Sequence, residues 1–415
     1  MKLIKDLFYR QVDRTIEEVI KVDQHNEQSV VGEIEEYVFT DSLQQHFATL
    51  LDELLRSKTK PREGIGVWVS GFFGSGKSLF AKMLAYVIEN RTLLGSPASS
   101  RFIEQTEAQL NDNKIKELLT FINRDLPFKA IVFDVSMDRG TRSGNERITE
   151  ILYRKVLQEF GYPTDFDLAA LEIKLEKQEK LESFKVKFRE LGFGDWDVEK
   201  KLDPLNEASA TLHAMAPTTY PNSDSWSNTV GKAGREDITP NLLAERAFEL
   251  AKRRFPGKAL IFIVDEVGQY VARSEDKMLD LQAVVQAFGR EGKNRAETQE
   301  IVSPAWLIVT AQEKLNEVVS ALDSKRIELG KMQERFRLQL DLNQADISEV
   351  TGKRVLAKSD AGKDYLQTLY HQNEARLAET TSLERSARKQ NLHADRFTEL
   401  SPSLPYQIDL CIDVV

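Results

Sequence analysis

The stretch Gly66 to Ala85, GVWVSGFFGSGKSLFAKMLA, decides the fold of this chain. Its apolar run Val67 to Val69 has the composition of a short buried strand, and helical spacing begins after Ser78. Between them, Gly71 to Ser78 fits the pattern G-x-x-x-x-G-K-[ST]. Glycines in such a turn let backbone N–H groups curl around a phosphate, and the helix N-terminus adds a favourable dipole. The sequence therefore predicts a phosphate-binding loop.

Two side chains of this loop have specific expected roles. Lys77 is expected to reach the β and γ phosphates of ATP, and the hydroxyl of Ser78 to bind Mg²⁺. The alternative is a glycine turn that only caps a helix, but the flanking strand and helix favour the phosphate loop. The predicted nucleotide contacts are Gly71, Phe72, Phe73, Gly74, Ser75, Gly76, Lys77, Ser78 and Leu79.

Two carboxylates directly follow the apolar run Ala259 to Val264. A strand that ends in this way delivers both side chains to the carboxyl edge of its sheet. We expect Asp265 to join the magnesium shell and Glu266 to polarise the attacking water. An N-cap or a solvated turn would be the ordinary reading of Asp-Glu after a lone strand. The phosphate loop upstream favours the hydrolytic pair.

Apolar runs predict five strands separated by helical patterns. Alternation of strands and helices is typical of a parallel sheet covered on both faces, whose ligands bind beyond the carboxyl ends of the strands. One strand lies between the phosphate loop and the Asp-Glu strand, which matches the division of P-loop proteins with a catalytic glutamate. We expect an α/β P-loop NTPase fold with a five-stranded parallel sheet. The strands are predicted at Val67–Val69, Ala130–Val135, Ala259–Val264, Trp306–Thr310 and Phe336–Leu342.

Composition divides the chain into five parts. Residues 1–60 are predicted to be an N-terminal segment and a helix that Thr40, Asp41 or Ser42 caps. The ATPase core is expected at 61–164 and 236–345, interrupted at 165–235 by a charged helical insertion with a flexible tail. The charge run 171–190 is predicted to be a solvated helix, with a partner-binding arm as the alternative.

Residues 346–415 are predicted to form a smaller helical lid. The closing stretch Ser401 to Val415 enters an amphipathic pattern without a cap or stop signal. We therefore expect the lid to be truncated and the sequence to be the N-terminal fragment of a longer protein.

The whole-chain composition narrows the class of protein. The chain has 415 residues, a formal net charge of -9 and 41% hydrophobic residues, and no run approaches the roughly 18 apolar residues that a membrane span needs. Cys411 is the only cysteine, so an internal disulfide is excluded. The negative charge disfavours nonspecific DNA binding by the chain as a whole and leaves a local basic patch open. We expect a cytoplasmic protein.

Polar residues near the fourth and fifth strands are further candidates. The hydroxyl of Thr310, or the amide of Gln312, is expected to contact the γ-phosphate or the attacking water, unless Thr310 simply ends its strand. Arg335 precedes the fifth strand, where a guanidinium can reach the active site of a neighbouring subunit. Arg337 competes for this role. The alternative for Arg335 is a surface ion pair with Glu334 or Asp341.

Four stretches of the sequence resemble the BrxC-type ATPases of bacteriophage-exclusion (BREX) defence systems. More broadly, the order of these motifs resembles AAA+ and related ATPases. The stretches are EIEEYVFTDSL at Glu33 to Leu43, the phosphate-loop stretch at Gly66 to Ala85, IFIVDEVGQYV at Ile261 to Val271, and AWLIVTAQEKL at Ala305 to Leu315.

The resemblance implies nucleotide-dependent assembly into a homo-oligomer and partners that include a DNA methyltransferase and a phosphatase-like protein. DNA would be engaged directly or through these partners. The resemblance also implies a position near the adenine for Tyr37 to Thr40 and a sensor arginine in the lid, for which Arg385 and Arg388 are candidates.

The function expected from these features is an ATP-hydrolysing, Mg²⁺-dependent switch or motor subunit of an anti-phage complex. A nucleotide-gated scaffold that binds ATP with negligible turnover is the alternative. A P-loop kinase is disfavoured because no acceptor pocket is evident in the sequence.

Overall fold

The central sheet has five strands, all parallel, in the order β4-β5-β6-β1-β7. A computed structural model describes residues 3–12, 26–109, 113–135, 146–230, 237–272, 274–322, 329–343, 349–381, 392–404, 406–408 and 410. All five predicted strands are confirmed, and so is the α/β class with a parallel sheet. The strands are β1 (Gly66–Ser70), β4 (Phe128–Asp134), β5 (Ala259–Asp265), β6 (Trp306–Ala311) and β7 (Leu338–Asp341).

Burial on both faces explains why these runs form strands. Every residue of β1 and β5 is buried, as expected for parallel strands that helices cover on both sides. Alternate side chains of β1 enter different cores: Trp68 packs in one, and Val67 and Val69 pack in the other. The strand β7 is a half-exposed edge, as its alternating sequence predicted.

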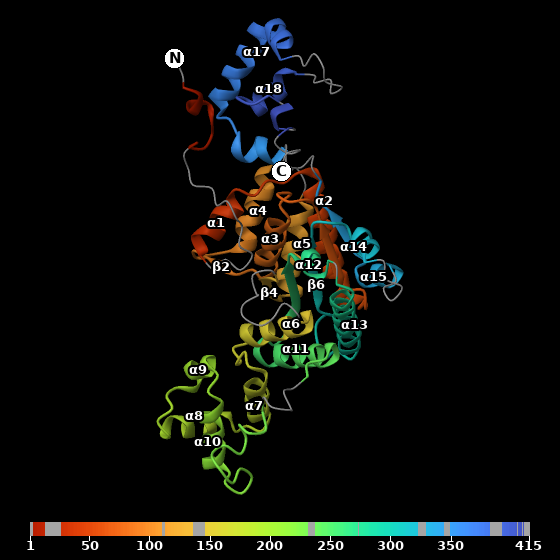
Figure 1. The fold of residues 1–415 in the computed structure, drawn as a ribbon. Helices are drawn as coiled ribbons and strands as arrows, with labels where there is room; N and C mark the ends of the chain where they lie inside the picture. The colour runs from red at the N-terminus through yellow and green to blue at the C-terminus, as the bar shows by residue number, and fades with distance from the viewer. Residues whose placement is uncertain are drawn as a thin grey trace.

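Helices cover the two faces of the sheet in separate sets, as Figure 1 shows. One face carries α1 (Glu27–Glu35), α2 (Asp41–Thr59), α3 (Lys77–Glu89), α4 (Ala98–Gln109) and α5 (Lys114–Asp125). The other carries α6 (Ile148–Glu159), α11 (Pro240–Arg254), α12 (Val267–Val271), α13 (Glu275–Glu297), α14 (Leu315–Ala321) and α15 (Leu329–Arg335). A short hairpin of β2 (Thr92–Leu93) and β3 (Ser96–Pro97) joins α3 to α4.

Thr40 caps α2, as predicted, and accepts a hydrogen bond at Oγ1 from the backbone N–H of Leu43 at 3.1 Å. Helix α1 lies within the stretch 1–60, in which the sequence predicted only one helix. No helix of the described residues is long and apolar enough to cross a membrane.

The insertion forms a small helical unit with a core of its own. Its elements are α7 (Phe166–Lys177), α8 (Leu181–Glu190), α9 (Trp196–Glu199), η2 (Lys200–Leu202) and α10 (Leu205–Met215). The charge run 171–190 is therefore not one solvated helix. It breaks at Glu179, which has a positive φ of 57°, and Phe184 and Phe188 of the second half pack on Trp196.

A buried polar group sits inside this unit. Glu172, only 1% exposed, accepts a hydrogen bond from Trp196 Nε1 at 2.9 Å and pairs with Lys200 Nζ at 3.1 Å. Helix α10 occupies part of the stretch that we expected to be flexible, because Ala208, Ser209 and Leu212 are buried.

The C-terminal unit is helical, as predicted, and the first described residues of the chain pack on it. It contains η3 (Thr351–Val355), α17 (Asp360–Thr380) and α18 (Ala394–Leu400). The segment Leu3 to Val12, with η1 (Ile4–Leu7), packs on it beside α17 (Figure 1). Ser359 N donates to Leu7 O at 3.0 Å, and Tyr9 N donates to Ala357 O at 2.8 Å. We call this segment the N-terminal strap.

One carboxylate of the core joins both parts of this unit. Glu36, at the end of α1, pairs with Arg10 of the N-terminal strap at 2.8 Å and with Arg354 of η3 at 3.1 Å. Lys353 Nζ also donates to Phe39 O at 3.5 Å. The contacts between core and C-terminal unit thus gather on the turn after α1.

Candidate functional site

The predicted phosphate loop connects β1 to α3 at the carboxyl edge of the sheet. Gly76 caps α3 with a φ of 87°, a left-handed conformation that favours glycine. A Cβ built on Gly71 would lie 2.5 Å from Ser75 Oγ and 3.0 Å from Leu342 O, so a side chain cannot be accommodated there. The glycines of the motif are therefore needed by this backbone.

Lys77 bends back over its own loop. Its side chain is buried, and Nζ donates a hydrogen bond to Phe72 O at 2.9 Å. Burial lowers the pKa of Lys77, while Glu266, Asp265 and Glu313 act against that shift. The lysine therefore lies within the field of the two predicted carboxylates.

The other loop residues differ in exposure. Phe73 is 67% exposed at the tip of the loop, and Leu79 packs at the edge of the core beneath it. Ser75 closes the turn by donating its backbone N–H to Phe72 O at 3.2 Å. Its Oγ is buried and has no hydrogen-bond partner among the described residues. A buried hydroxyl inside a loop of backbone donors can donate a hydrogen bond to a phosphate oxygen. The loop therefore fits the nucleotide phosphates that its sequence implies.

Asp265 and Ser78, the two side chains expected to hold Mg²⁺, meet beside the loop. Asp265 is 3% exposed, and the hydroxyls of Thr310 and Ser78 both hydrogen-bond its carboxylate. Burial raises the pKa of Asp265, although these hydrogen bonds oppose the shift. Hard oxygen ligands of this kind are those that Mg²⁺ prefers.

Glu266 has an uncommon backbone conformation. Its φ is 59°, in the left-handed region, and it starts the short helix α12. One carboxylate oxygen, Oε2, is buried without a hydrogen-bond partner in the described part of the chain. Burial and the neighbouring Asp265 raise the pKa of Glu266, and Lys77 opposes this. Such strain in a non-glycine residue concentrates at functional sites.

Thr310, which we expected to contact the γ-phosphate or the attacking water, contacts both predicted carboxylate residues. Thr310 is fully buried; its hydroxyl donates to Asp265 and accepts from the backbone N–H of Glu266. It therefore positions the two carboxylates and is not directed at the loop. Gln312 is half-buried beyond the end of β6 and remains the candidate of the predicted pair for a direct contact.

Arg335 lies at the opposite edge of the sheet from the phosphate loop. It ends α15, and Phe336 and Arg337 separate it from the first residue of β7; its backbone oxygen would lie 2.7 Å from a Cβ on Gly66, the first residue of β1. The side chain is half-buried, and no ion pair joins it to Glu334 or Asp341 within the described ranges. It cannot reach the loop of its own chain, and its role in a neighbouring subunit stays a prediction.

Arg335 opens onto a cavity of about 670 Å³ rich in cationic side chains. Its Nε is buried and, among the described residues, lacks a hydrogen-bond partner. The competing candidate Arg337 is exposed and lines the same cavity, together with Arg62 and Lys293.

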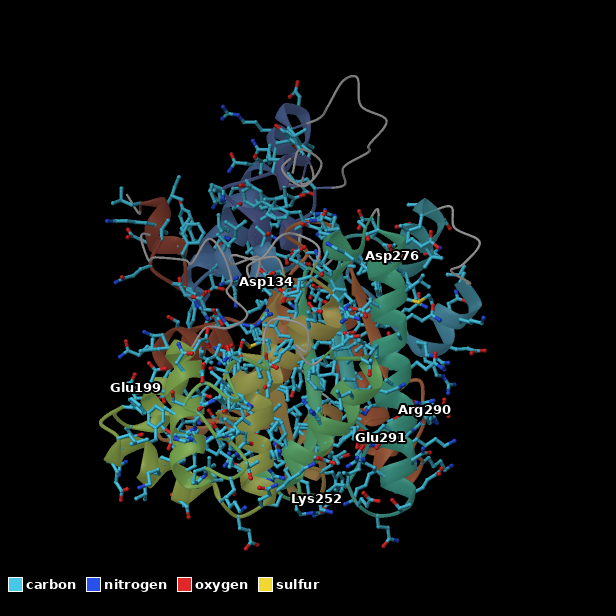
Figure 2. The ribbon with its side chains drawn as sticks, turned by 60° about the horizontal axis from the view of Figure 1, so that its bottom comes forward. Asp134, Glu199, Lys252, Asp276, Arg290 and Glu291 are labelled. Atoms are coloured by element: carbon cyan, nitrogen blue, oxygen red, sulfur yellow. The ribbon has the colours of Figure 1, made fainter. Side chains whose placement is uncertain are left out.

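Two acidic residues of the site were missed in the sequence. Asp134 ends β4 in register with Asp265, and its charge raises the pKa of both Asp265 and Glu266. Figure 2 labels Asp134 and Lys252 toward opposite ends of the core. The second is Glu313, which follows β6. Trp68 Nε1 donates a hydrogen bond to the backbone oxygen of Glu313 at 3.1 Å. An acidic residue at the end of a predicted strand was the available signal for Asp134.

The expected adenine region borders a second cavity. The side chain of Gln109, in α4, makes two hydrogen bonds to the stretch Tyr37 to Thr40. It accepts from Phe39 N at 2.9 Å and donates to Tyr37 O at 2.7 Å. Tyr37 and Val38 line a cavity of about 870 Å³ whose other wall is the C-terminal unit. The candidate lid arginines Arg385 and Arg388 lie outside the described residues.

No protein-family model matches the sequence of this chain, and no solved structure gives a significant match. The candidate site is therefore argued from the residues of the chain itself.

Proposed function

We propose that this chain is a Mg²⁺-dependent ATPase of the P-loop, AAA+-like type. The observation that carries the proposal is the meeting of four side chains at the carboxyl edge of one parallel sheet. Lys77 and Ser78 come from the loop, and Asp265 and Glu266 come from the end of β5. Parallel sheets place ligands at this edge.

The four side chains divide the work of the reaction. The loop N–H groups and Lys77 would bind the phosphates, and Ser78 with Asp265 would hold Mg²⁺. The metal, when bound, neutralises charge that develops on the phosphate oxygens. Because the pKa of Glu266 is raised, its carboxylate is a stronger base than an exposed glutamate, and it would take a proton from the attacking water.

The charge balance of the site supports a contribution from outside the chain. Lys77 faces several carboxylates, and a nucleoside triphosphate would add further negative charge. A second cation beyond Mg²⁺ would stabilise that charge in the transition state. Arg335 of another copy is the candidate, since its own copy holds it at the opposite sheet edge. The carboxylates at the site are Asp134, Asp265, Glu266 and Glu313.

In the cell, we propose a switch or motor subunit of a BREX-type anti-phage complex. This part rests on the four BrxC-like stretches alone. The nucleotide state would control the oligomer and its engagement of DNA, of a DNA methyltransferase or of a phosphatase-like protein. A nucleotide-gated scaffold would use the same site without turnover.

Two variants test the ATPase proposal directly. Lys77→Ala should abolish binding of MgATP, whereas Glu266→Gln should bind MgATP and release phosphate at least 100-fold more slowly than the original chain. Lys201→Ala and Glu297→Gln, both on exposed positions, are the matched controls. Binding without phosphate release in the original chain would favour the scaffold. Equal turnover in Glu266→Gln and the original chain would overturn the mechanism.

A further inference from the structure

Asp341, the last residue of β7, contacts three elements around the phosphate loop. It stands in register with Ser70, the last residue of β1, and the buried hydroxyl of Ser70 donates a hydrogen bond to its Oδ1. Lys314 Nζ lies 2.9 Å from Oδ2. His46 Nε2 of α2 lies 3.1 Å from the Asp341 backbone oxygen. One residue thus joins β1, α2 and the turn after β6.

Two of these contacts, those with Ser70 and Lys314, border residues of the candidate nucleotide site. Ser70 directly precedes Gly71, the first residue of the loop. Lys314 directly follows Glu313, whose charge acts on both Lys77 and Glu266. Leu342, the residue after Asp341, adds backbone contacts with the same part of the chain. Its N–H donates to Ser70 O at 2.8 Å, and its carbonyl oxygen lies next to Gly71.

The carboxylate of Asp341 is suited to this task in its ionised form. Burial alone would favour the neutral acid, but hydrogen bonds from Ser70 and Lys314 outweigh it and lower the pKa of Asp341. A charged acceptor makes stronger hydrogen bonds than a neutral one. Both oxygens are used, one for each neighbour.

We propose that Asp341 is a positioning residue of the candidate site, which holds the entrance of the phosphate loop and the turn that carries Glu313 in one fixed relation. It does not touch the reacting atoms. Without its carboxylate, the buried Ser70 hydroxyl loses its acceptor and Lys314 loses its ion pair, so the loop and the turn move independently. The link to nucleotide binding rests on the ATPase proposal; the mechanical coupling does not.

Hydrogen–deuterium exchange of the nucleotide-free full chain tests the coupling. In Asp341→Ala, peptides that cover Ser70 to Leu79 should exchange about tenfold faster, because the buried Ser70 hydroxyl loses its charged acceptor. Peptides that cover Trp306 to Leu315 should exchange about two- to fivefold faster, because the side chains of Lys314 and Asp341 are 54% and 40% exposed and an exposed ion pair contributes less. Ser70→Ala should accelerate the first peptide and Lys314→Ala the second. Asp360→Asn, which removes a 98% exposed partner of Lys363, should change neither.

Nucleotide kinetics then separate positioning from general support of the fold. Asp341→Ala should raise the KM for MgATP about tenfold with kcat nearly unchanged, and Asp341→Asn should fall between it and the original chain, because an amide still accepts from Ser70. A uniform rise in exchange across the core, or kcat and KM both unaffected in a chain that hydrolyses ATP, would overturn the proposal. If the original chain binds no nucleotide but the two peptides respond together, the ATPase proposal fails and the coupling stands.

Discussion

Thr310 Oγ1 accepts a hydrogen bond from the backbone N–H of Glu266, with 2.9 Å between the two atoms. A buried hydroxyl on β6 thereby supports the turn in which Glu266 takes its left-handed φ. The same hydroxyl donates to Asp265, so one side chain of the neighbouring strand sets the position of both carboxylates.

Thr310→Ala should therefore impair turnover more than nucleotide binding. The change leaves a buried N–H without its acceptor, which costs about 1–3 kcal/mol of stability, and lets Glu266 leave its position. We expect phosphate release to fall about tenfold or more, with thermal unfolding as the stability measurement. Thr310→Ser keeps the hydroxyl and should retain most of the activity. Equal turnover in the alanine variant and the original chain would contradict this role.

The half-buried carboxylate of Glu266 should make the nucleotide-free protein less stable at neutral pH. Its pKa is raised on folding, so the folded state binds more protons than the unfolded state between the two pKa values. This contribution to stability is full below the ordinary glutamate pKa of about 4.3 and is lost as pH rises through the folded pKa.

Glu266→Gln should therefore raise the melting temperature at pH 7, and the difference should vanish near pH 4. Asp341→Asn provides a control of opposite sign, because the pKa of Asp341 is lowered and its charge stabilises the fold. Melting curves without nucleotide at several pH values measure both. A Glu266→Gln protein that is less stable than the original at pH 7 would show that the ionised carboxylate of Glu266 does not destabilise the folded protein.

Glu36 should set how firmly the C-terminal unit docks on the core. Glu36→Ala removes two ion pairs that are about one-fifth to one-third exposed, with an expected loss of roughly 1–2 kcal/mol in docking. Limited proteolysis between the two parts should accelerate while the core stays intact. The adjacent Glu35→Gln, whose carboxylate is 56% exposed and 3.9 Å from Arg101, should leave the cleavage rate unchanged.

Glu172 should decide the stability of the insertion without affecting the ATP site. Glu172→Ala leaves the buried Lys200 with one fewer partner, and breaking a buried pair costs about 3–5 kcal/mol. Hydrogen exchange should rise mainly within Leu181 to Met215, because α7 also packs on the core of the sheet through Phe166 and Ile173. Glu182→Ala, at an 84% exposed position, is the control. Exchange that rises equally in α3 and β5 would contradict an independent unit.

Arg335 should act on the ATP site of a neighbouring subunit. Arg335→Ala should slow phosphate release by about 10³-fold or more, the size of effect seen for arginine fingers. Mixing Arg335→Ala with Lys77→Ala chains should recover some activity, because a mixed pair can build one complete site. Arg337→Ala is tested beside it as the competing candidate. Mixtures no more active than either variant alone would count against a finger at Arg335.

Those parts of the fold were predictable in which function or burial requires certain residue types at neighbouring positions in the sequence. The loop requires glycines at defined positions, and a parallel strand such as β5 is apolar on both faces, so both could be recognised in the sequence. The placement of Asp134 beside Asp265 was not predicted, because it depends on which strands become neighbours. The role of Thr310 also depends on a contact 44 positions away, which no local pattern reveals.

Other features were missed for different physical reasons. The N-terminal strap contains only four helical residues, too few for a periodic signal. The core of the insertion is formed by single aromatic residues such as Phe184, Phe188 and Trp196, spaced among charged residues that suggested a solvated helix.

The N-terminal strap also has a consequence for how the chain is made. Leu7 and Ser359, which contact each other, are 352 positions apart. On a ribosome, the strap emerges well before the surface that it binds, because the core and the insertion lie between them in the sequence. A contact of such long range is costly to close and folds slowly. The strap therefore stays exposed and undocked while the core folds around the central sheet. Docking of the strap therefore becomes a step that follows synthesis of the core.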